Sequence, residues 1–208
     1  MGMIPYTILK DNPVLSNLSV GPDQCVVEIG SERGEGSTAF LYNWAHERGL
    51  QFYSVDVVPD AQQHFSDMPA DFNFCLTSAG SVWCRDQLPL VQKRIKVLYL
   101  DNFDWIDPNN LQYQWLHDQI AAYAERGVVM NNENCQEEHR LQALYCLPYM
   151  DHESIVLIDD SWVDSGTPTG FNGKCGTAIP VFIAAGYKVR VDETTDKYKL
   201  FLYRGIDL

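Results

Sequence analysis

The feature that most constrains the fold is a pair of strand-like segments near the C-terminus, because only a short connection joins them. These segments, YKVRV (187–191) and YKLFLYR (198–204), flank the sequence DETTD. A connection of this length cannot carry the chain across a sheet to a parallel neighbour, so we expect an antiparallel hairpin. A sheet with such an ending differs from the six-stranded, all-parallel sheet of the dinucleotide-binding fold.

Five earlier segments are predicted to be strands of a parallel sheet. Each is a short and nearly continuous apolar run, which is typical of strands covered on both faces. Predicted helices lie between them, and this order indicates an α/β fold with one domain over residues 1–208. The predicted strands are 25–30, 51–57, 72–78, 96–101 and 154–160, and the predicted helices are 37–48, 81–91, 111–126 and 136–147.

The chain is strongly acidic, with a formal net charge of −13. A surface with this charge repels phosphate backbones, which argues against nucleic acid and anionic membranes as partners. No stretch approaches the ~20 apolar residues that a membrane span requires. The first residues lack a basic region followed by an apolar run, so we expect no secretory signal and a cytoplasmic protein. The 6 cysteines form no C-x-x-C pair and are expected to be reduced thiols.

The stretch VVEIGSERGEGST (26–38) predicts a glycine-rich turn between a strand and a helix, where a ligand can approach the backbone. Its glycines, Gly30, Gly34 and Gly36, depart from the G-x-G-x-x-G spacing of dinucleotide-binding turns. Glu28 lies just before the turn, where its carboxylate would repel a pyrophosphate but attract an ammonium group. The turn therefore favours a ligand with a positively charged amino-acid end; a purely structural turn is the alternative.

Another acid, Asp56, follows the next predicted strand in the sequence YSVDVV. A carboxylate at this place can accept hydrogen bonds from both hydroxyls of a ribose. NAD-dependent enzymes use the same device, so Asp56 supports an adenosine ligand without choosing between cofactors. A solvated acid in a turn is the alternative interpretation.

Two further predicted strands end in acids, which are Asp101 and Asp104 after one strand and Asp159 and Asp160 after the other. The carboxyl ends of neighbouring parallel strands meet at one edge of a sheet, so three of these carboxylates are expected to converge. Converging carboxylates either raise one another's pKa or hold a cation. Oxygen ligands suit Mg²⁺, Ca²⁺ or Mn²⁺, while capping of helices or loop amides is the alternative.

The sequence VEIGSERGEGST resembles the first motif of class I S-adenosylmethionine-dependent methyltransferases, and the order of predicted elements is similar to theirs. The resemblance spans about residues 23–205. It implies a Rossmann-like methyltransferase sheet, mostly parallel with a C-terminal antiparallel hairpin and helices on both faces, and S-adenosylmethionine as the cofactor. The residues that it places against the cofactor are Glu28, Gly30, Ser31, Gly34 and Ser37 at the methionine end, Asp56 at the ribose, and Thr77 and Ser78 at the adenine.

Metal-dependent O-methyltransferases similar to the catechol and macrolide-sugar enzymes carry acids where this chain has Asp101, Asp159 and Asp160. The resemblance implies that these three residues hold a divalent ion such as Mg²⁺, which would lower the pKa of a substrate hydroxyl and orient it. The catechol enzymes carry a lysine as general base where this chain has Asp104. We therefore expect Asp104 to be the base, with His139 as the alternative.

The glycine-rich segment GFNGKCG (170–176) leaves two interpretations open. In one, Lys174 reaches an acidic substrate or the carboxylates at the strand ends. In the other, the segment is a mobile lid that shapes the substrate pocket. Aromatic residues near these loops either stack on a planar substrate or pack in the interior, and they are Trp105, Trp162 and Phe171.

These patterns predict an enzyme that transfers a methyl group from S-adenosylmethionine to a small-molecule hydroxyl with the help of a divalent metal. One alternative is a hydroxylase or oxidoreductase on the same scaffold with iron held by the acids. Such a site normally uses two histidines, and none is adjacent to these acids in the sequence. The other alternative is a non-catalytic nucleoside-binding protein. The sequence does not identify the methyl acceptor, and it leaves open whether the chain forms a homo-oligomer.

Overall fold

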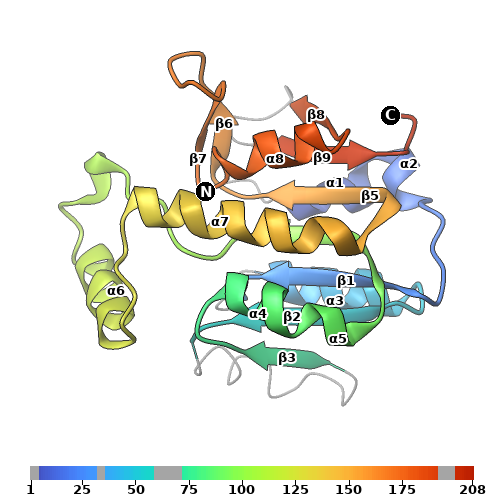
Figure 1. The fold of residues 1–208 in the computed structure, drawn as a ribbon, viewed down its shortest axis with the longest axis horizontal. Helices are drawn as coiled ribbons and strands as arrows, with labels where there is room; N and C mark the ends of the chain where they lie inside the picture. Colours follow the sequence, from blue (N-terminus) through green and yellow to red (C-terminus); the bar gives the residue numbers. More distant parts are fainter. Residues whose placement is uncertain (1–4, 32–35, 59–71, 192–199) are drawn as a thin grey trace.

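The structure is a computed structural model that describes residues 5–31, 36–58, 72–191 and 200–208. Its centre is a seven-stranded sheet with the order β3-β2-β1-β4-β5-β9-β8 (Figure 1). This mostly parallel sheet with one reversed strand confirms the predicted fold class. The strands of the sheet are β1 (Gln24–Ile29), β2 (Gln51–Asp56), β3 (Asn73–Leu76), β4 (Arg94–Leu100), β5 (Met150–Ile158), β8 (Lys188–Val191) and β9 (Leu200–Arg204).

The five strands predicted to be parallel are all present and pair in parallel. β1 lies between β2 and β4, and β3 and β5 extend the sheet on either side. The strands at the centre are buried along most of their length, as in β4, where every residue from Ile95 to Leu100 is buried. Nearly continuous apolar runs form these strands because helices cover both faces of the sheet.

The predicted C-terminal hairpin is also confirmed. β8 and β9 pair antiparallel, with Lys188 opposite Tyr203 and Val191 opposite Leu200. β9 is also antiparallel to β5, so it is the reversed strand of the sheet. The connection between β8 and β9 lies outside the described residues.

The helices form a layer on each face of the sheet (Figure 1). The N-terminal helices and α3 pack on one face around Leu41 and Tyr99, whereas α4, α5, α7 and α8 pack on the other around Leu98 and Phe182. The helices are α1 (Ile8–Asp11), α2 (Pro13–Ser16), α3 (Ser37–His46), α4 (Gly80–Asp86), α5 (Leu88–Val91), α6 (Gln114–Glu125), α7 (Asn132–Cys146) and α8 (Ala178–Ala184), with short 3₁₀ turns η1 (Pro5–Thr7), η3 (Pro108–Asn110) and η4 (Leu147–Tyr149).

Several elements differ from the sequence prediction; β5, for example, begins at Met150 and not at residue 154. The helix predicted over 81–91 is divided into α4 and α5, because Pro89 lacks the N–H that a continuous helix needs. The helix predicted over 136–147 begins earlier, since the Asn131 side chain accepts a hydrogen bond from the N–H of Asn134 and caps it. A small antiparallel pair that was not predicted, β6 (Ser161–Val163) with β7 (Phe171–Gly173), follows β5.

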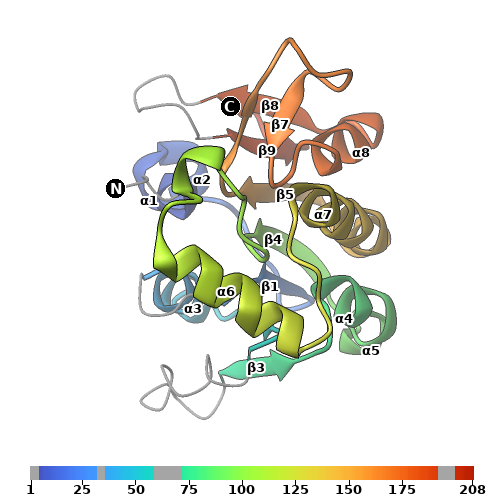
Figure 2. The same ribbon diagram turned by 90° about the vertical axis from the view of Figure 1, so that its left-hand side faces the viewer.

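The carboxyl ends of the parallel strands meet at one edge of the sheet, and α6 crosses in front of this edge (Figure 2). α6 follows β4 through the loop 101–113 and packs there around Phe103, Leu116 and Tyr123. The described residues at the carboxyl ends of β1, β2, β4 and β5 therefore lie near α6. In the part of the chain that the structure describes, no helix is both long and apolar enough to span a membrane.

Candidate functional site

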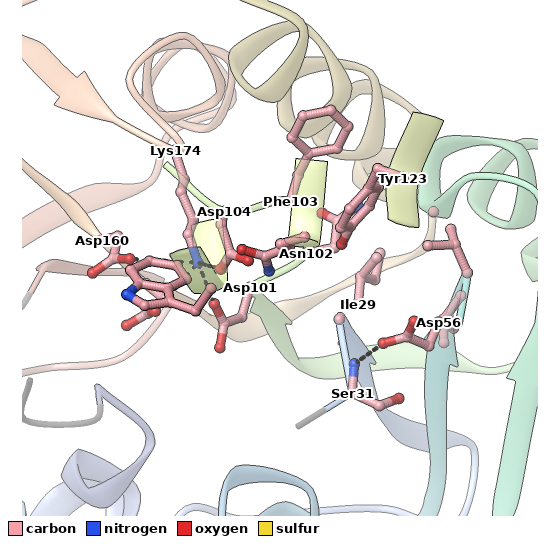
Figure 3. Close-up of a pocket in the computed structure, with 17 residues that line it drawn as sticks. Ile29, Ser31, Asp56, Asp101, Asn102, Phe103, Asp104, Tyr123, Asp160 and Lys174 are labelled. Carbon is pink, nitrogen blue, oxygen red and sulfur yellow. Dashed lines mark hydrogen bonds and ion pairs between the residues drawn. The ribbon is translucent and has the colours of Figure 1, made fainter. Parts of the chain in front are cut away.

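A cavity of about 460 Å³ lies at the carboxyl edge of the sheet. Its walls come from the turn after β1, the end of β2, the start of α4, the loop after β4, α6, the end of β5 and Lys174. Figure 3 shows Ser31 and Asp56 at one end of this cavity and the group around Lys174 at the other. Ligand sites of open α/β sheets occur at this edge, and the volume suits a small ligand.

The glycine turn brings the backbone of the β1 loop against the loop after β4. Gly30 has a φ of +96°, and a Cβ at this position would lie 2.4 Å from the backbone nitrogen of Asn102. A side chain cannot fit there, so the turn requires glycine. The next residue, Ser31, donates its backbone N–H to Oδ2 of Asp56 at 2.8 Å. Gly30, Ser31 and Asp56, all predicted to bind the cofactor, therefore line the same end of the cavity.

Glu28 has a different environment from the one expected of a cofactor ligand. It is fully buried and is not among the lining residues of the cavity. Burial raises its pKa from 4.5 to about 8, although hydrogen bonds from three hydroxyls partly oppose the shift. The hydroxyls belong to Ser37 (3.1 Å), Thr38 (2.7 Å) and Ser54 (2.6 Å). Glu28 thus joins β1 to the start of α3 and to β2, beneath the glycine turn.

Three further residues predicted to bind the cofactor, Ser37, Thr77 and Ser78, do not line the cavity. Ser37 is buried at the start of α3 and is directed to Glu28. Thr77 and Ser78 follow β3, and the Thr77 hydroxyl donates to the carbonyl of Ala79 at 3.0 Å. Gly34 lies outside the described residues. Contacts of these residues with a cofactor stay a prediction.

At the other end, four carboxylates lie around the ammonium of Lys174, and Figure 3 shows Asp101, Asp104 and Asp160 beside it. Its Nζ lies 2.7 Å from Oδ1 of Asp101 and 3.5 Å from an oxygen of both Asp159 and Asp160. Asp104 Oδ1 is 3.9 Å away. The predicted convergence of the acids at the strand ends is therefore present. The structure confirms one interpretation of segment 170–176, namely the contact between Lys174 and these carboxylates.

The local backbone holds Lys174 in this position. Its N–H donates to the carbonyl oxygen of Asp160 at 3.0 Å, and the N–H of Cys175 donates to Oγ of Ser161 at 2.9 Å. Gly173 has a φ of +84°, and a Cβ there would lie only 2.0 Å from the Asp160 carbonyl oxygen. Since a side chain at this position would clash, glycine allows the chain to place Lys174 over the end of β5.

Burial and charge have opposite effects on the pKa values of Lys174 and Asp101, whereas both raise the pKa of Asp159. Burial lowers the pKa of Lys174, but the surrounding carboxylates outweigh it and raise this pKa well above its usual value. Burial raises the pKa of Asp101, yet the Lys174 ammonium holds it below its usual value. Burial and the neighbouring charge of Asp101 raise the pKa of Asp159 well above the usual value. Lys174 is therefore a permanent cation at neutral pH.

The position of Lys174 bears directly on the predicted metal site. Within the described residues, no group of three or more His, Cys, Asp or Glu side chains is arranged to hold a metal ion. The acids predicted as ligands instead face an ammonium that is only 2% exposed. A divalent ion does not fit among these oxygens while the ammonium is there, because two cations would repel each other at short range. The same argument applies to iron in the hydroxylase alternative.

The two residues predicted as bases lie in different surroundings. Asp104 lines the cavity, with its side chain 39% exposed. His139 is fully buried in α7, where its Nδ1 lies 2.8 Å from the carbonyl oxygen of Cys135. Burial lowers the pKa of His139 to about 4, and this side chain is not part of the cavity wall.

Aromatic residues singled out in the sequence pack against each other or against the interior. The rings of Trp105 and Trp162 meet edge to face at 5.8 Å, and Phe171 packs against the core. The aromatic side chains that do line the cavity are Phe103, Trp115 and Tyr123. Among these, Trp115 is 52% exposed.

α6 supplies cavity residues that the sequence analysis missed, namely Trp115, Gln119 and Tyr123. The buried amide oxygen of Gln119 has no hydrogen-bond partner among the described residues and is an acceptor at the cavity wall. The sequence carried one signal, since two aromatic residues and an amide recur on one face of the predicted helix at a spacing of four.

Solved methyltransferase structures share this fold. CalS11, a TDP-rhamnose 3′-O-methyltransferase in calicheamicin biosynthesis, superposes with a TM-score of 0.52 at 14% sequence identity, covering 96% of this chain and 75% of that one. SMU.1697c, a methyltransferase candidate from Streptococcus mutans in complex with SAH, superposes with a TM-score of 0.51 at 12% identity, covering 98% and 99%. The sequence matches no protein-family model, and no curated protein is similar to it.

Proposed function

We propose that this chain is an S-adenosylmethionine-dependent methyltransferase that acts on a hydroxyl group of a small molecule. The observation that carries the proposal is that one cavity joins Ser31 and Asp56 at one end to Asp104 and Lys174 at the other. A nucleoside at the first end and an acceptor at the second would meet inside a single space. The shared fold with solved methyltransferases supports the same conclusion.

The charge of the cavity supports this cofactor over a dinucleotide. The described lining residues carry five carboxylates and one ammonium, so the wall is strongly negative. S-adenosylmethionine carries a sulfonium and an ammonium beside a single carboxylate, and such a wall attracts its net positive charge. A pyrophosphate brings negative charges, which the same wall repels.

The transfer itself needs little chemistry from the protein. When bound, S-adenosylmethionine would supply an electrophilic methyl group, which the acceptor oxygen would take as the bond from carbon to sulfur breaks, with S-adenosylhomocysteine as the second product. The hydroxyl proton passes to a carboxylate, for which we propose Asp104 because it lines the cavity and is partly exposed. His139 has no part in this proposal because its ring is buried away from the cavity. Divalent metal assistance has no part in it either, because the predicted ligands surround Lys174.

Calorimetric titration of the purified protein with S-adenosylmethionine, S-adenosylhomocysteine and NAD tests the cofactor. We expect the first two to bind and to raise the melting temperature, since a ligand at ~100 times its Kd stabilises by ~2.7 kcal/mol. NAD should do neither. Transfer of a labelled methyl group to a panel of small hydroxyl compounds then tests the reaction. Absence of binding by both S-adenosyl compounds at ~1 mM would overturn the proposal.

A further inference from the structure

The group around Lys174 differs from an ordinary surface ion pair in its burial and in its number of acids. The Lys174 side chain is 2% exposed, while Asp101 and Asp159 are 22% and 26% exposed. Four carboxylates lie within 3.9 Å of one nitrogen. Acids gathered this closely need a positive charge among them, because their mutual repulsion is strong in a partly buried site.

The acids contact the Lys174 ammonium at different distances. The shortest contact, 2.7 Å to Asp101 Oδ1, is a charge-assisted hydrogen bond. The second oxygen of Asp101 accepts a hydrogen bond from the hydroxyl of Tyr99 at 2.8 Å, which fixes the orientation of this carboxylate. The oxygens of Asp159 and Asp160 at 3.5 Å complete the negative surroundings of Nζ.

The main chain of Lys174 is attached to the end of β5, the strand that Asp159 and Asp160 follow. The hydrogen bond from its N–H to Asp160 and the close approach of Gly173 to that residue fix the start of the side chain. A lysine held in this way differs from a flexible surface lysine that a metal ion displaces.

We propose that Lys174 is the resident cation of this site, so that its ammonium holds Asp101, Asp159 and Asp160 together and excludes a divalent ion from them. Removal of the ammonium converts the same carboxylates into a binding site for a divalent cation. The inference stands on the geometry of the group and does not depend on whether the cavity transfers a methyl group.

Titration of the metal-free protein with Mn²⁺, followed by electron paramagnetic resonance of the free ion, tests this inference. We expect the wild-type protein to leave the Mn²⁺ signal unchanged apart from weak surface binding. Lys174→Ala should bind one Mn²⁺ per chain at least ~100-fold more tightly, because a positive charge has left the group and space for the ion has opened. Lys174→Ala combined with Asp159→Asn should lose most of this gain.

Lys96 provides a matched control for the loss of a buried lysine. Its side chain is also 2% exposed, but among the described residues its ion pairs are with only two acids, Asp151 at 3.8 Å and Glu153 at 3.5 Å. Lys96→Ala should therefore gain no tight Mn²⁺ site. A gain equal to that of Lys174→Ala would contradict a role specific to the Lys174 group.

Two results would overturn the inference. One is stoichiometric Mn²⁺ binding by the wild-type protein that Asp159→Asn abolishes. The other is a folded Lys174→Ala variant, verified by circular dichroism, that binds Mn²⁺ no better than wild type. Where Lys174→Ala does not fold, Lys174→Gln retains most of the side-chain length without the charge, and its Mn²⁺ affinity decides in the same way. The wild-type measurement needs no variant.

Discussion

The backbone N–H of Ser31 donates a hydrogen bond to Oδ2 of Asp56 at 2.8 Å and ties the glycine turn to the end of β2. The other oxygen, Oδ1, accepts from the N–H of Val58 at 2.7 Å. Two backbone donors fix the orientation of this carboxylate at the cavity wall. Asp56 therefore shapes the turn and offers acceptors to the cavity at the same time.

Asp56→Ala should weaken the binding of S-adenosylhomocysteine by at least ~10-fold, because it removes charged acceptors that a ribose would use. Isothermal titration calorimetry measures the change in Kd. Asp11→Ala, at an exposed position at the end of α1, is the matched control and should bind like wild type. An unchanged Kd in Asp56→Ala, with the fold intact, would contradict the placement of the ribose at this end.

Glu28 predicts a dependence of stability on pH. Its pKa rises from 4.5 to about 8 in the folded chain, so between these values the folded state binds more protons than the unfolded state. The free energy of unfolding must then fall as pH rises through this window. Glu28→Gln removes the titration, so its stability relative to wild type should increase from about pH 5 to about pH 8.

Urea unfolding at several pH values checks this expectation. Glu47→Gln is a suitable control, because the Glu47 side chain is 72% exposed, and it should leave the pH dependence as it is in wild type. If the pH dependence of Glu28→Gln is the same as that of wild type, the buried carboxyl group is not the source of the effect.

Alanine substitutions at Gly173 and Gly170 separate the cost of a steric clash in the Lys174 loop from the cost of backbone strain. Both have positive φ, +84° and +77°, but an added Cβ meets the Asp160 carbonyl at 2.0 Å in the first and nothing within 4 Å in the second. Gly170→Ala should cost about 1–2 kcal/mol of unfolding free energy. Gly173→Ala should cost clearly more, because the loop must move as well. Equal losses in thermal or urea unfolding would show that this contact does not constrain the loop.

The sequence was sufficient to predict the sheet and the meeting of the acids. Nearly continuous apolar runs such as 97–100 indicate strands buried on both faces, and parallel strands of this kind carry their terminal acids to one edge. The C-terminal hairpin followed from the length of its connection. These features depend on local patterns or on topology, both of which can be read from one sequence.

The remaining features depend on contacts between distant segments. Glu28 was predicted to face the cofactor, whereas it lies beneath the turn because Ser54 is its neighbour on β2 and Thr38 lies above it on α3. The positive φ of Gly173 that directs Lys174 toward the acids depends on the close approach of Asp160. No periodicity in the sequence reveals either contact, and the same holds for the placement of α6 over the cavity.

The last prediction concerns the role of Asp104 as the proton acceptor in methyl transfer. If its carboxylate takes the proton of the acceptor hydroxyl, Asp104→Asn should lower kcat by ~10²–10⁴ while the Kd for S-adenosylhomocysteine stays near that of wild type. Labelled methyl transfer to an acceptor identified in the panel measures the first quantity, and calorimetry measures the second. Asp118→Asn, on the exposed side of α6, is the matched control and should retain both. Full turnover in Asp104→Asn would remove Asp104 from the reaction. A parallel loss of cofactor affinity would instead indicate that this acid supports binding, since a proton acceptor for the hydroxyl has no contact with the nucleoside.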